Sequence, residues 1–225
     1  MKMKTVKFFL SLLCCVALLT SCTRTKNEYF EDGSLQSSIQ YRFGKETGVS
    51  KYYFINAPHP LKIMMEMKDG KRNGDFVKYF ITGKVETRCT YKDDLEEGLE
   101  ENFSIYGYKV SDIHFLHGKK HGPIVYYHEN GEIKEQGSFA EDMFDGHWTY
   151  YDERGVMVGE GDFDKGTGVQ KGFNANGNIT RIIHYVNNVK NGEDIELGND
   201  GDTLKVTVFE NDRIVSVNGE SVTND

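Results

Sequence analysis

Hydrophobic and polar residues alternate along most of the chain, with short polar interruptions that contain glycine. Residues 123–128 (PIVYYH) and 132–139 (EIKEQGSF) show this clearly, because both runs are rich in β-branched and aromatic residues. A period of two with this composition predicts β-strands. Asn130-Gly131 lies between the two runs, and this dipeptide favours a tight hairpin turn. The whole stretch therefore predicts one β-hairpin.

The hairpin pattern recurs with a period of 24 residues. If Gly122 is position zero, glycine falls at +9 and +24 and an aromatic residue at +17. Eight such units begin at residues 24, 48, 74, 98, 122, 146, 168 and 192, the second two residues longer and the sixth two residues shorter than the rest. Position +5 is aromatic in seven of them: Tyr29, Tyr53, Tyr79, Phe103, Tyr127, Tyr151 and Phe173, with Leu197 in the last. Repetition of this kind predicts an array of stacked supersecondary units.

The apolar positions also predict the hairpin register. A two-residue loop would place +5 opposite +12, whereas a three-residue loop with a left-handed glycine places +5 opposite +11. Position +11 is the more apolar of the two, as in Leu35, Val85, Ile133, Met157 and Ile179. We therefore expect Tyr127 to face Ile133. A regular second strand would further place +11, +13, +15 and +17 on one face.

The predicted fold is all-β: an elongated antiparallel meander of about eight β-hairpin repeats in a single twisted sheet, after an N-terminal signal helix. It would hold up to sixteen short strands, and sheets this wide twist or curl. Polar, glycine-rich connections such as 117–122 would join the units. The repeat domain is expected over residues 22–216 and a C-terminal tail over 217–225. Edge strands should be short, charged or covered.

The N-terminus predicts an exported protein. Three lysines precede an apolar run, Phe8–Leu19, which is too short for a comfortable membrane span, so residues 1–21 are expected to be a signal peptide. Leu19-Thr20-Ser21-Cys22 is similar to a bacterial lipobox. That resemblance implies cleavage before Cys22 and lipidation of its thiol, with acyl chains as a membrane anchor. The alternative is an ordinary secretory signal with a chance cysteine.

Charge and cysteine content narrow the function classes. Loss of residues 1–21 removes Lys2, Lys4 and Lys7 but no acidic residue, so the net charge goes from −8 to −11. Such an acidic chain does not suit nucleic acid or a position flat on anionic lipid, and no nucleic acid is expected as a partner. After cleavage and lipidation only Cys89 is a free cysteine, so no disulfide can form within the mature chain.

Two stretches carry a family resemblance. GHWTYYDERG (146–155) and GDFVKYFITG (74–83) follow the form Gly-x-Trp/Phe-x-x-Tyr-x-x-x-Gly, and the resemblance extends over nearly all of residues 24–216. This resembles the variant MORN repeat of bacterial proteins called YwqK-type antitoxins. The resemblance implies repeated β-hairpins and no shared catalytic residues, and the antitoxin name says little about mechanism.

The residues that could bind a metal or act in catalysis are better explained by their positions in the repeat. His114, His117, His121 and His128 could ligate zinc or copper, but each occupies a turn or polar position of the repeat. Cys89 takes a position held by isoleucine in three other units, so a buried hydrophobe is favoured over a reactive thiol. The acidic run 93–101 is expected to form a solvated turn. Trp148 is expected to have a structural role. No catalytic residues, metal or cofactor are expected, and no GxSxG, HExxH or P-loop pattern is present.

The aromatic row at +5 is the candidate recognition face for a peptide, glycan or protein: Tyr79, Phe103, Tyr127, Tyr151 and Phe173. The same row could instead only join neighbouring hairpins. We expect a lipid-anchored, non-catalytic binding or scaffold protein of the bacterial cell envelope, on the periplasmic side of the outer membrane, with an unknown partner. An antitoxin or immunity protein is the first alternative. The second is an envelope enzyme with a site at the proline-containing insertion, residues 56–61.

Overall fold

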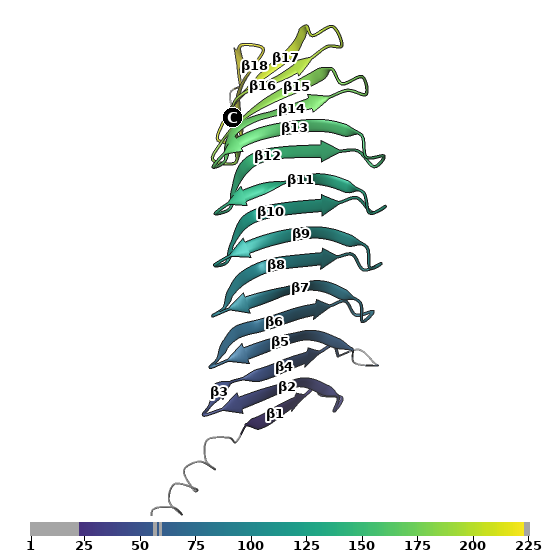
Figure 1. Ribbon diagram of the computed structural model, residues 1–225, viewed down its shortest axis with the longest axis vertical. Helices are drawn as coiled ribbons and strands as arrows, with labels where there is room; N and C mark the ends of the chain where they lie inside the picture. Colours follow the sequence, from purple (N-terminus) through teal and green to yellow (C-terminus); the bar gives the residue numbers. More distant parts are fainter. Residues whose placement is uncertain (1–22, 56–57, 59, 223–225) are drawn as a thin grey trace, which may run out of the picture.

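A computed structural model describes residues 23–55, 58 and 60–222, which form one open antiparallel sheet of nineteen strands (Figure 1). Each strand pairs with the next along the chain, except that both β3 and β4 pair with β2. The strands are β1 Arg24–Tyr29, β2 Leu35–Arg42, β3 Lys45–Glu46, β4 Gly48–Tyr53, β5 Leu61–Lys68, β6 Lys71–Tyr79, β7 Val85–Lys92, β8 Leu95–Phe103, β9 Lys109–Leu116, β10 Lys119–Tyr127, β11 Ile133–Ala140, β12 Met143–Tyr151, β13 Met157–Asp164, β14 Thr167–Phe173, β15 Ile179–Val186, β16 Val189–Leu197, β17 Thr203–Glu210, β18 Arg213–Val217 and β19 Glu220–Ser221. The predicted all-β hairpin meander is confirmed.

The C-terminal end of the sheet differs from the sequence-based expectation, whereas the N-terminal edge agrees with it. The sheet continues past residue 216 through β18 and β19, because the chain adds one more hairpin after the last unit. At the other end β1 is exposed along its whole length and carries Arg24, Lys26 and Glu28, charges that discourage pairing with another edge. The expected signal helix and Cys22 lie outside the described residues. No helix in the described part of the chain is long and apolar enough to cross a bilayer.

The predicted hairpin register is confirmed. Tyr127 pairs with Ile133, and in every unit the +5 residue pairs with the first residue of the following strand. The backbone N–H of His128 donates to the carbonyl of Glu132 at 2.8 Å, which closes a three-residue loop. Gly131 has a φ of 88°, the left-handed conformation that this loop requires.

One prediction about the faces is wrong. Tyr126 pairs with Glu135 while Tyr127 pairs with Ile133, so Lys134 is an extra residue in β11, a β-bulge. The bulge puts Ile133 on the opposite face from Glu135. Positions +5 and +11 therefore share a face with +1, +3, +14 and +16, which we call the polar face. Positions +2, +4, +13, +15 and +17 form the other, which we call the aromatic face.

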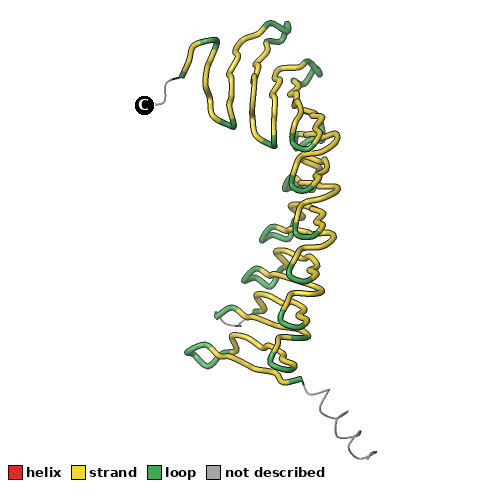
Figure 2. Tube along the Cα trace, turned by 90° about the vertical axis from the view of Figure 1, so that its left-hand side faces the viewer, coloured by secondary structure: helices red, strands yellow, loops and turns green. Residues whose placement is uncertain are grey.

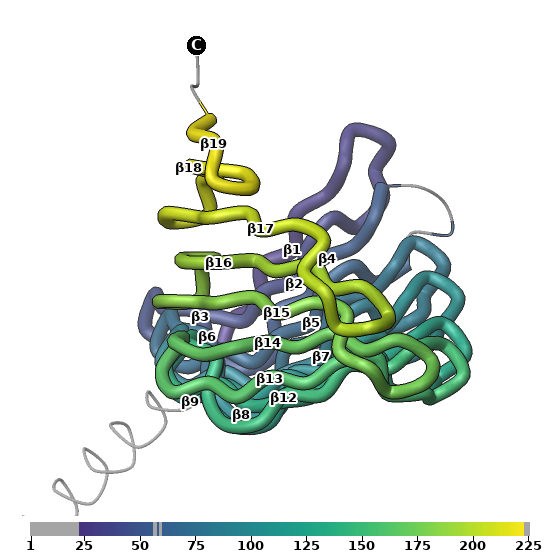
Figure 3. The backbone as a smooth tube through the Cα atoms, turned by 90° about the horizontal axis from the view of Figure 1, so that it is seen from above, coloured from purple at the N-terminus to yellow at the C-terminus, as the bar shows by residue number. Residues whose placement is uncertain are grey.

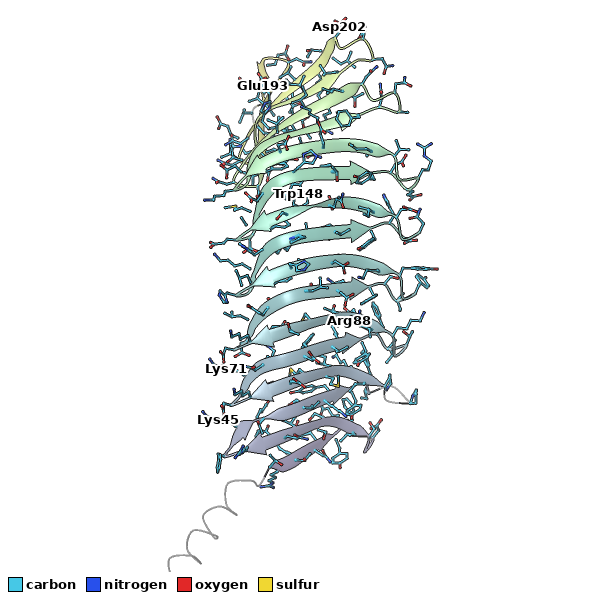
Figure 4. The ribbon with its side chains drawn as sticks, viewed as in Figure 1. Lys45, Lys71, Arg88, Trp148, Glu193 and Asp202 are labelled. Carbon is cyan, nitrogen blue, oxygen red and sulfur yellow. The ribbon has the colours of Figure 1, made fainter. Side chains whose placement is uncertain are left out.

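The core lies on the aromatic face. Its central cluster comprises five buried side chains, Ile113, Ile124, Phe139, Trp148 and Phe163. Trp148 is only 2% exposed although a single sheet has no second layer above it. Figure 4 places Trp148 in the middle of the sheet. The twisted strands and the rows of rings from consecutive hairpins cover one another, which accounts for burial in one layer.

The units are joined by tighter turns than expected. Each connection has two turn residues with positive φ, such as His117 (53°) and Gly118 (78°), as in a type I′ turn. The strands therefore extend into the predicted connections. Successive turns stack: the Lys120 N–H donates to the side chain of Asp142 at 2.9 Å, and the Lys190 N–H to Asp212 at 2.7 Å. These contacts form a ladder along the edge, which we call the turn edge.

A second bulge explains the length of the regular unit. Between β9 and β10, the three residues 121–123 lie opposite the single residue His114. Gly122 takes a φ of 92° at the centre of this bulge, where a residue with a side chain would be strained. The same shift occurs where β5, β7, β11 and β15 meet the following strand.

The short unit lacks this bulge. β13 and β14 pair without any register shift, so two fewer residues are needed. Gly168 lies in this pair, where a Cβ would collide with the carbonyl of Asp162. The change in direction of the sheet occurs in this region: the strands beyond it are seen side by side in Figure 2, whereas the earlier ones are seen end on. From above, the strands fan around the long axis instead of stacking in one plane (Figure 3).

Asn188 bridges the short unit on the turn edge. Its side-chain carbonyl accepts from the Phe144 N–H at 2.8 Å, and its amide donates to the carbonyl of Asp142 at 2.7 Å. Its own N–H donates to the carbonyl of Gly166 at 2.9 Å. The side chain thus reaches past one turn to the turn before it. It can do so because Gly166 has no side chain in the way.

Candidate binding surfaces

The row at +5 lies on the polar face, beside the hairpin loops. Tyr79, Phe103, Tyr127, Tyr151 and Phe173 are all half-buried and follow one another once per hairpin. Two strand spacings separate neighbours, so the rings recur about every 10 Å. The Tyr127 hydroxyl donates to Asp112 of the preceding hairpin at 2.9 Å, and the Arg88 guanidinium lies 5.5 Å from the Phe103 ring. Each of these two rings therefore also joins two hairpins.

Charged groups flank the row. Glu101 accepts hydrogen bonds from Arg88 and Lys109, which together lower the pKa of its carboxyl to about 2. Lys109 also pairs with Asp112 at 2.8 Å. Burial and the hydrogen bond to Asp112 raise the pKa of the Tyr127 phenol. The surface thus combines half-buried rings with fixed hydrogen-bonding groups, a pattern suited to an extended polar ligand.

Three histidines have structural contacts with backbone carbonyls. Nδ1 of His114 lies 3.0 Å from the carbonyl of Pro123, and Nδ1 of His184 lies 2.8 Å from the carbonyl of Glu193. A carbonyl only accepts, so each ring donates to the backbone of the neighbouring bulge. His128 reaches the carbonyl of Tyr151 in the same way at 2.9 Å. Among the residues that the structure describes, no group of three or more His, Cys, Asp or Glu side chains could hold a metal ion.

Cys89 and the acidic run also have ordinary roles. Cys89 is buried on the aromatic face, and burial raises the pKa of its thiol to about 12, which keeps it protonated and unreactive. In the acidic run, Asp94 accepts from the Arg72 N–H at 2.9 Å and Glu97 from the His117 N–H at 3.0 Å. Both contacts stack one turn on the next. Of the insertion at 56–61, residues 56, 57 and 59 lie outside the described residues.

Sequence reasoning missed one exposed aromatic surface. The hairpin loop after β8 carries Ile105, Tyr106 and Tyr108, and Ile81 lies in the loop one hairpin earlier. Tyr106 is 70% exposed, and its ring centroid is 6.4 Å from that of Tyr108. We call these four residues the tip patch. Alignment of the loops would have revealed it, because the corresponding loop of the next unit is His128-Glu-Asn-Gly-Glu132.

The loop that carries the tip patch has the same backbone hydrogen bonds as the other hairpin loops. The Ser104 N–H donates to the carbonyl of Tyr108 at 2.8 Å, and the Gly107 N–H donates to the carbonyl of Ser104 at 2.8 Å. Lys84 from the preceding loop donates to the carbonyl of Tyr106 at 2.6 Å. The rings are therefore displayed on a fixed backbone, which lowers the entropic cost of binding.

Family comparison identifies the repeat in the middle of the chain. Residues 120–141, 144–165 and 167–187 match the MORN repeat variant family. Each match covers one hairpin: β10 with β11, β12 with β13, and β14 with β15. The matches and the shared register of the other hairpins together support a MORN repeat protein.

Other comparisons add no functional information. No curated protein sequence matches this chain. A crystal structure of a mutant of S. aureus TarM in complex with Fondaparinux, alpha-GlcNAc-glycerol and UDP is similar at 13% identity over 84% of this chain and 24% of that chain, with a TM-score of 0.18. A second crystal structure of TarM gives 12% identity, 81% and 22% coverage, and a TM-score of 0.16. The chain spans about a quarter of the length of these structures, and overlaps this poor carry no argument.

Proposed function

We propose that this protein is a lipid-anchored, non-catalytic binding and scaffold protein of the bacterial cell envelope, on the periplasmic side of the outer membrane. The observation that carries the binding role is the tip patch. The loops of the other units are mainly polar, yet this one displays two tyrosines and an isoleucine on a hydrogen-bonded backbone. Exposed tyrosines on a rigid support are typical anchors of protein interfaces.

The repeat itself supports a scaffold rather than an enzyme. The recurring polar side chains that would be expected in an active site are used to hold bulges and turns, as with His114, His184 and Asp142. The long sheet keeps the tip patch and the row at +5 at fixed distances from each other. An extended partner could contact the tip patch with one segment and the row of rings with another.

The anchor is tested at Cys22. Cys22→Ala removes the thiol that would carry the acyl chains, so the protein should move from the membrane fraction to the soluble fraction. The measurement is the distribution of the protein between the two fractions after cell lysis. Cys89→Ala is the matched control and should leave the distribution unchanged. Retention of the Cys22 variant in the membrane fraction would contradict the anchor.

The binding role is tested at the tip patch. Replacement of both Tyr106 and Tyr108 by serine should lower the yield of crosslinked partner from envelope membranes by about tenfold or more, because such anchors contribute at least about 2 kcal/mol. Arg154→Ser with Val156→Ser changes the same two loop positions two units further on and should leave the yield unchanged. Equal loss in both variants, or no loss in the first, would exclude the tip patch as the contact.

A further inference from the structure

A half-buried carboxylate on the aromatic face has no hydrogen bond or ion pair with any residue that the structure describes. It belongs to Glu135 on β11, which pairs directly with Tyr126 on β10 and Tyr150 on β12. Directly paired residues have Cβ atoms about 5 Å apart on one face of the sheet, so the carboxylate lies between the two tyrosine side chains. Lys134 in the adjacent bulge lowers the pKa of this carboxyl, but burial raises it by more.

The two phenols beside this carboxylate are also free to bind. In the described part of the chain, neither the Tyr126 nor the Tyr150 hydroxyl forms a hydrogen bond, although both side chains are half-buried. A tyrosine in such a place normally has a hydrogen-bond partner for its hydroxyl, as Tyr127 has in Asp112. One row of the sheet thus holds three neighbouring polar groups and two aromatic rings. Aromatic surface with a few convergent polar groups is the usual composition of a ligand site.

The nearest cations along the same row already have carboxylate partners. The row consists of the +4 and +13 positions, which pair with each other from strand to strand. In one direction the nearest cation is Arg181, three strands past Tyr150, and it donates to both oxygens of Asp194 at 2.7 Å. In the other direction it is Lys78 on β6, which pairs with Glu86. A cation that neutralises the carboxylate between the tyrosines would therefore come from outside this row.

The fold does not require an acidic residue at this position. The corresponding position of four other units holds Ser37, Thr87, Ser111 or Gly159. A half-buried carboxylate without a cation loses hydration and gains no ion pair in return, so its charge opposes folding. Proteins break such packing rules mainly at functional sites. Glu135 therefore has the character of a binding residue whose partner group is positively charged.

We infer that Tyr126, Glu135 and Tyr150 form a site for the guanidinium group of an arginine side chain of the partner protein. This inference rests on the proposed binding role. A guanidinium donates two parallel N–H groups to one carboxylate and stacks on aromatic rings, so it uses all three side chains at once. The net charge of −8 also favours a basic partner. We call these three residues the arginine site.

The spacing of the strands suits this group. β10 and β12 lie on either side of β11, so they are two strand spacings apart, about 10 Å (Figure 1). A flat group in contact with a ring on each side needs about 7–8 Å, because carbon atoms in contact are about 3.5–4 Å apart. A lysine ammonium would reach the carboxylate but has no flat surface to stack on the rings. Arginine and tyrosine are also among the residues that most often dominate protein interfaces.

The test titrates the full chain with the peptide acetyl-Gly-Arg-Gly-amide and obtains the dissociation constant from the peptide resonances by NMR. Glu135→Gln removes the charge and keeps the shape of the side chain, so it should weaken binding about tenfold or more. Glu129→Gln at the exposed tip of the same hairpin is the matched control and should bind as the wild type does. Tyr150→Leu should weaken binding about three- to fivefold. Replacement of the peptide's arginine by citrulline, which has the same shape and no charge, should weaken binding as much as Glu135→Gln does.

Each other outcome contradicts the inference. Equal affinity for the arginine and citrulline peptides would mean that the site does not recognise a cation, and equal loss in both glutamine variants would mean that only the net charge matters. Tighter binding of the corresponding lysine peptide would exclude guanidinium stacking. If the partner crosslinks equally well to Glu135→Gln, the arginine site is not part of that interface. Failure of the proposed binding role is recognised separately, because no partner would then crosslink in envelope membranes, whereas the peptide titration needs no partner.

Discussion

Trp148 shows how a single sheet builds a core at the level of individual residues. It pairs with Gly161 on β13 and covers Gly137 on β11, where a Cβ would collide with the indole ring. Its ring centroid lies 5.2 Å from that of Phe139 and 4.9 Å from that of Phe144. A large ring between two glycines fills the space that a second layer fills in a sandwich, because buried side chains must pack closely.

Glu135 is the residue on the aromatic face that opposes this packing. It pairs with Tyr126 on one side and Tyr150 on the other, and burial raises the pKa of its carboxyl. The charged form therefore opposes folding at neutral pH. A carboxyl with a raised pKa contributes its full stability below its unfolded pKa, and this contribution is lost as the pH rises through the folded value.

Glu135→Gln should therefore raise the free energy of unfolding at pH 7. The gain should fall toward zero at about pH 3.5, where the wild-type carboxyl is protonated in both states. Urea unfolding at the two pH values measures the difference. Glu129→Gln, at the exposed tip of the same hairpin, is the control and should change stability little at either pH. A loss of stability at pH 7 would mean that the Glu135 charge is needed.

At the level of the hairpin, the sequence predicted the register correctly and the faces of the second strand wrongly. Spacing and composition indicated a three-residue loop, and Tyr127 does face Ile133. The bulge at Lys134 could not be predicted, because a side chain in a bulge needs no particular chemistry. The aromatic residues at +5 and +17 therefore look alike in sequence but lie on opposite faces. The unit lengths were correct, and the two-residue deficit corresponds to the missing bulge between β13 and β14.

The turn edge gives a prediction at this same level. Asn188→Gly keeps a residue that tolerates the φ of 68° but removes the two side-chain hydrogen bonds to Phe144 and Asp142. The expected loss of stability is about 1–2 kcal/mol. Asn187→Gly changes the adjacent exposed turn residue, whose φ is 53°, and should be close to neutral. Denaturant unfolding measures the free energy of unfolding of the two variants. Equal losses would show that the side-chain bridge at Asn188 does not contribute to stability.

The whole molecule is held by contacts between neighbouring strands. Such a linear array should tolerate loss of an internal unit, because removal subtracts one repeat and one interface. Deletion of residues 98–121 joins Glu97 to Gly122, a glycine whose φ of 92° is close to the 81° of Gly98. We expect a shorter sheet that keeps its β signal in circular dichroism and unfolds cooperatively.

The control is a second deletion that removes only half of a repeat unit. Removal of residues 98–109 leaves a second strand without its partner strand and should abolish the β signal or cause aggregation. If the 24-residue deletion also abolishes the β signal, the hairpins do not behave as separable units and the repeat account fails.

At the same scale, the binding surfaces were harder to predict than the fold. The row at +5 follows from one position of the repeat, and the structure does place those residues in one row. A hollow on the turn edge gathers Lys45, Lys68, Lys71 and Lys92 from different positions around three turns. Only the stacking of those turns brings them to one hollow, so no single repeat position could reveal it.

The missing bulge has a consequence for how this protein's shape is encoded. Regular units propagate the sheet in one direction, and the single unit that is two residues short lies where that direction changes. The location of the corner thus follows the residue count of one repeat, in which Gly168 leaves room for the carbonyl of Asp162. Insertions and deletions of two residues could move such a corner along an array and create differently angled molecules from the same hairpin.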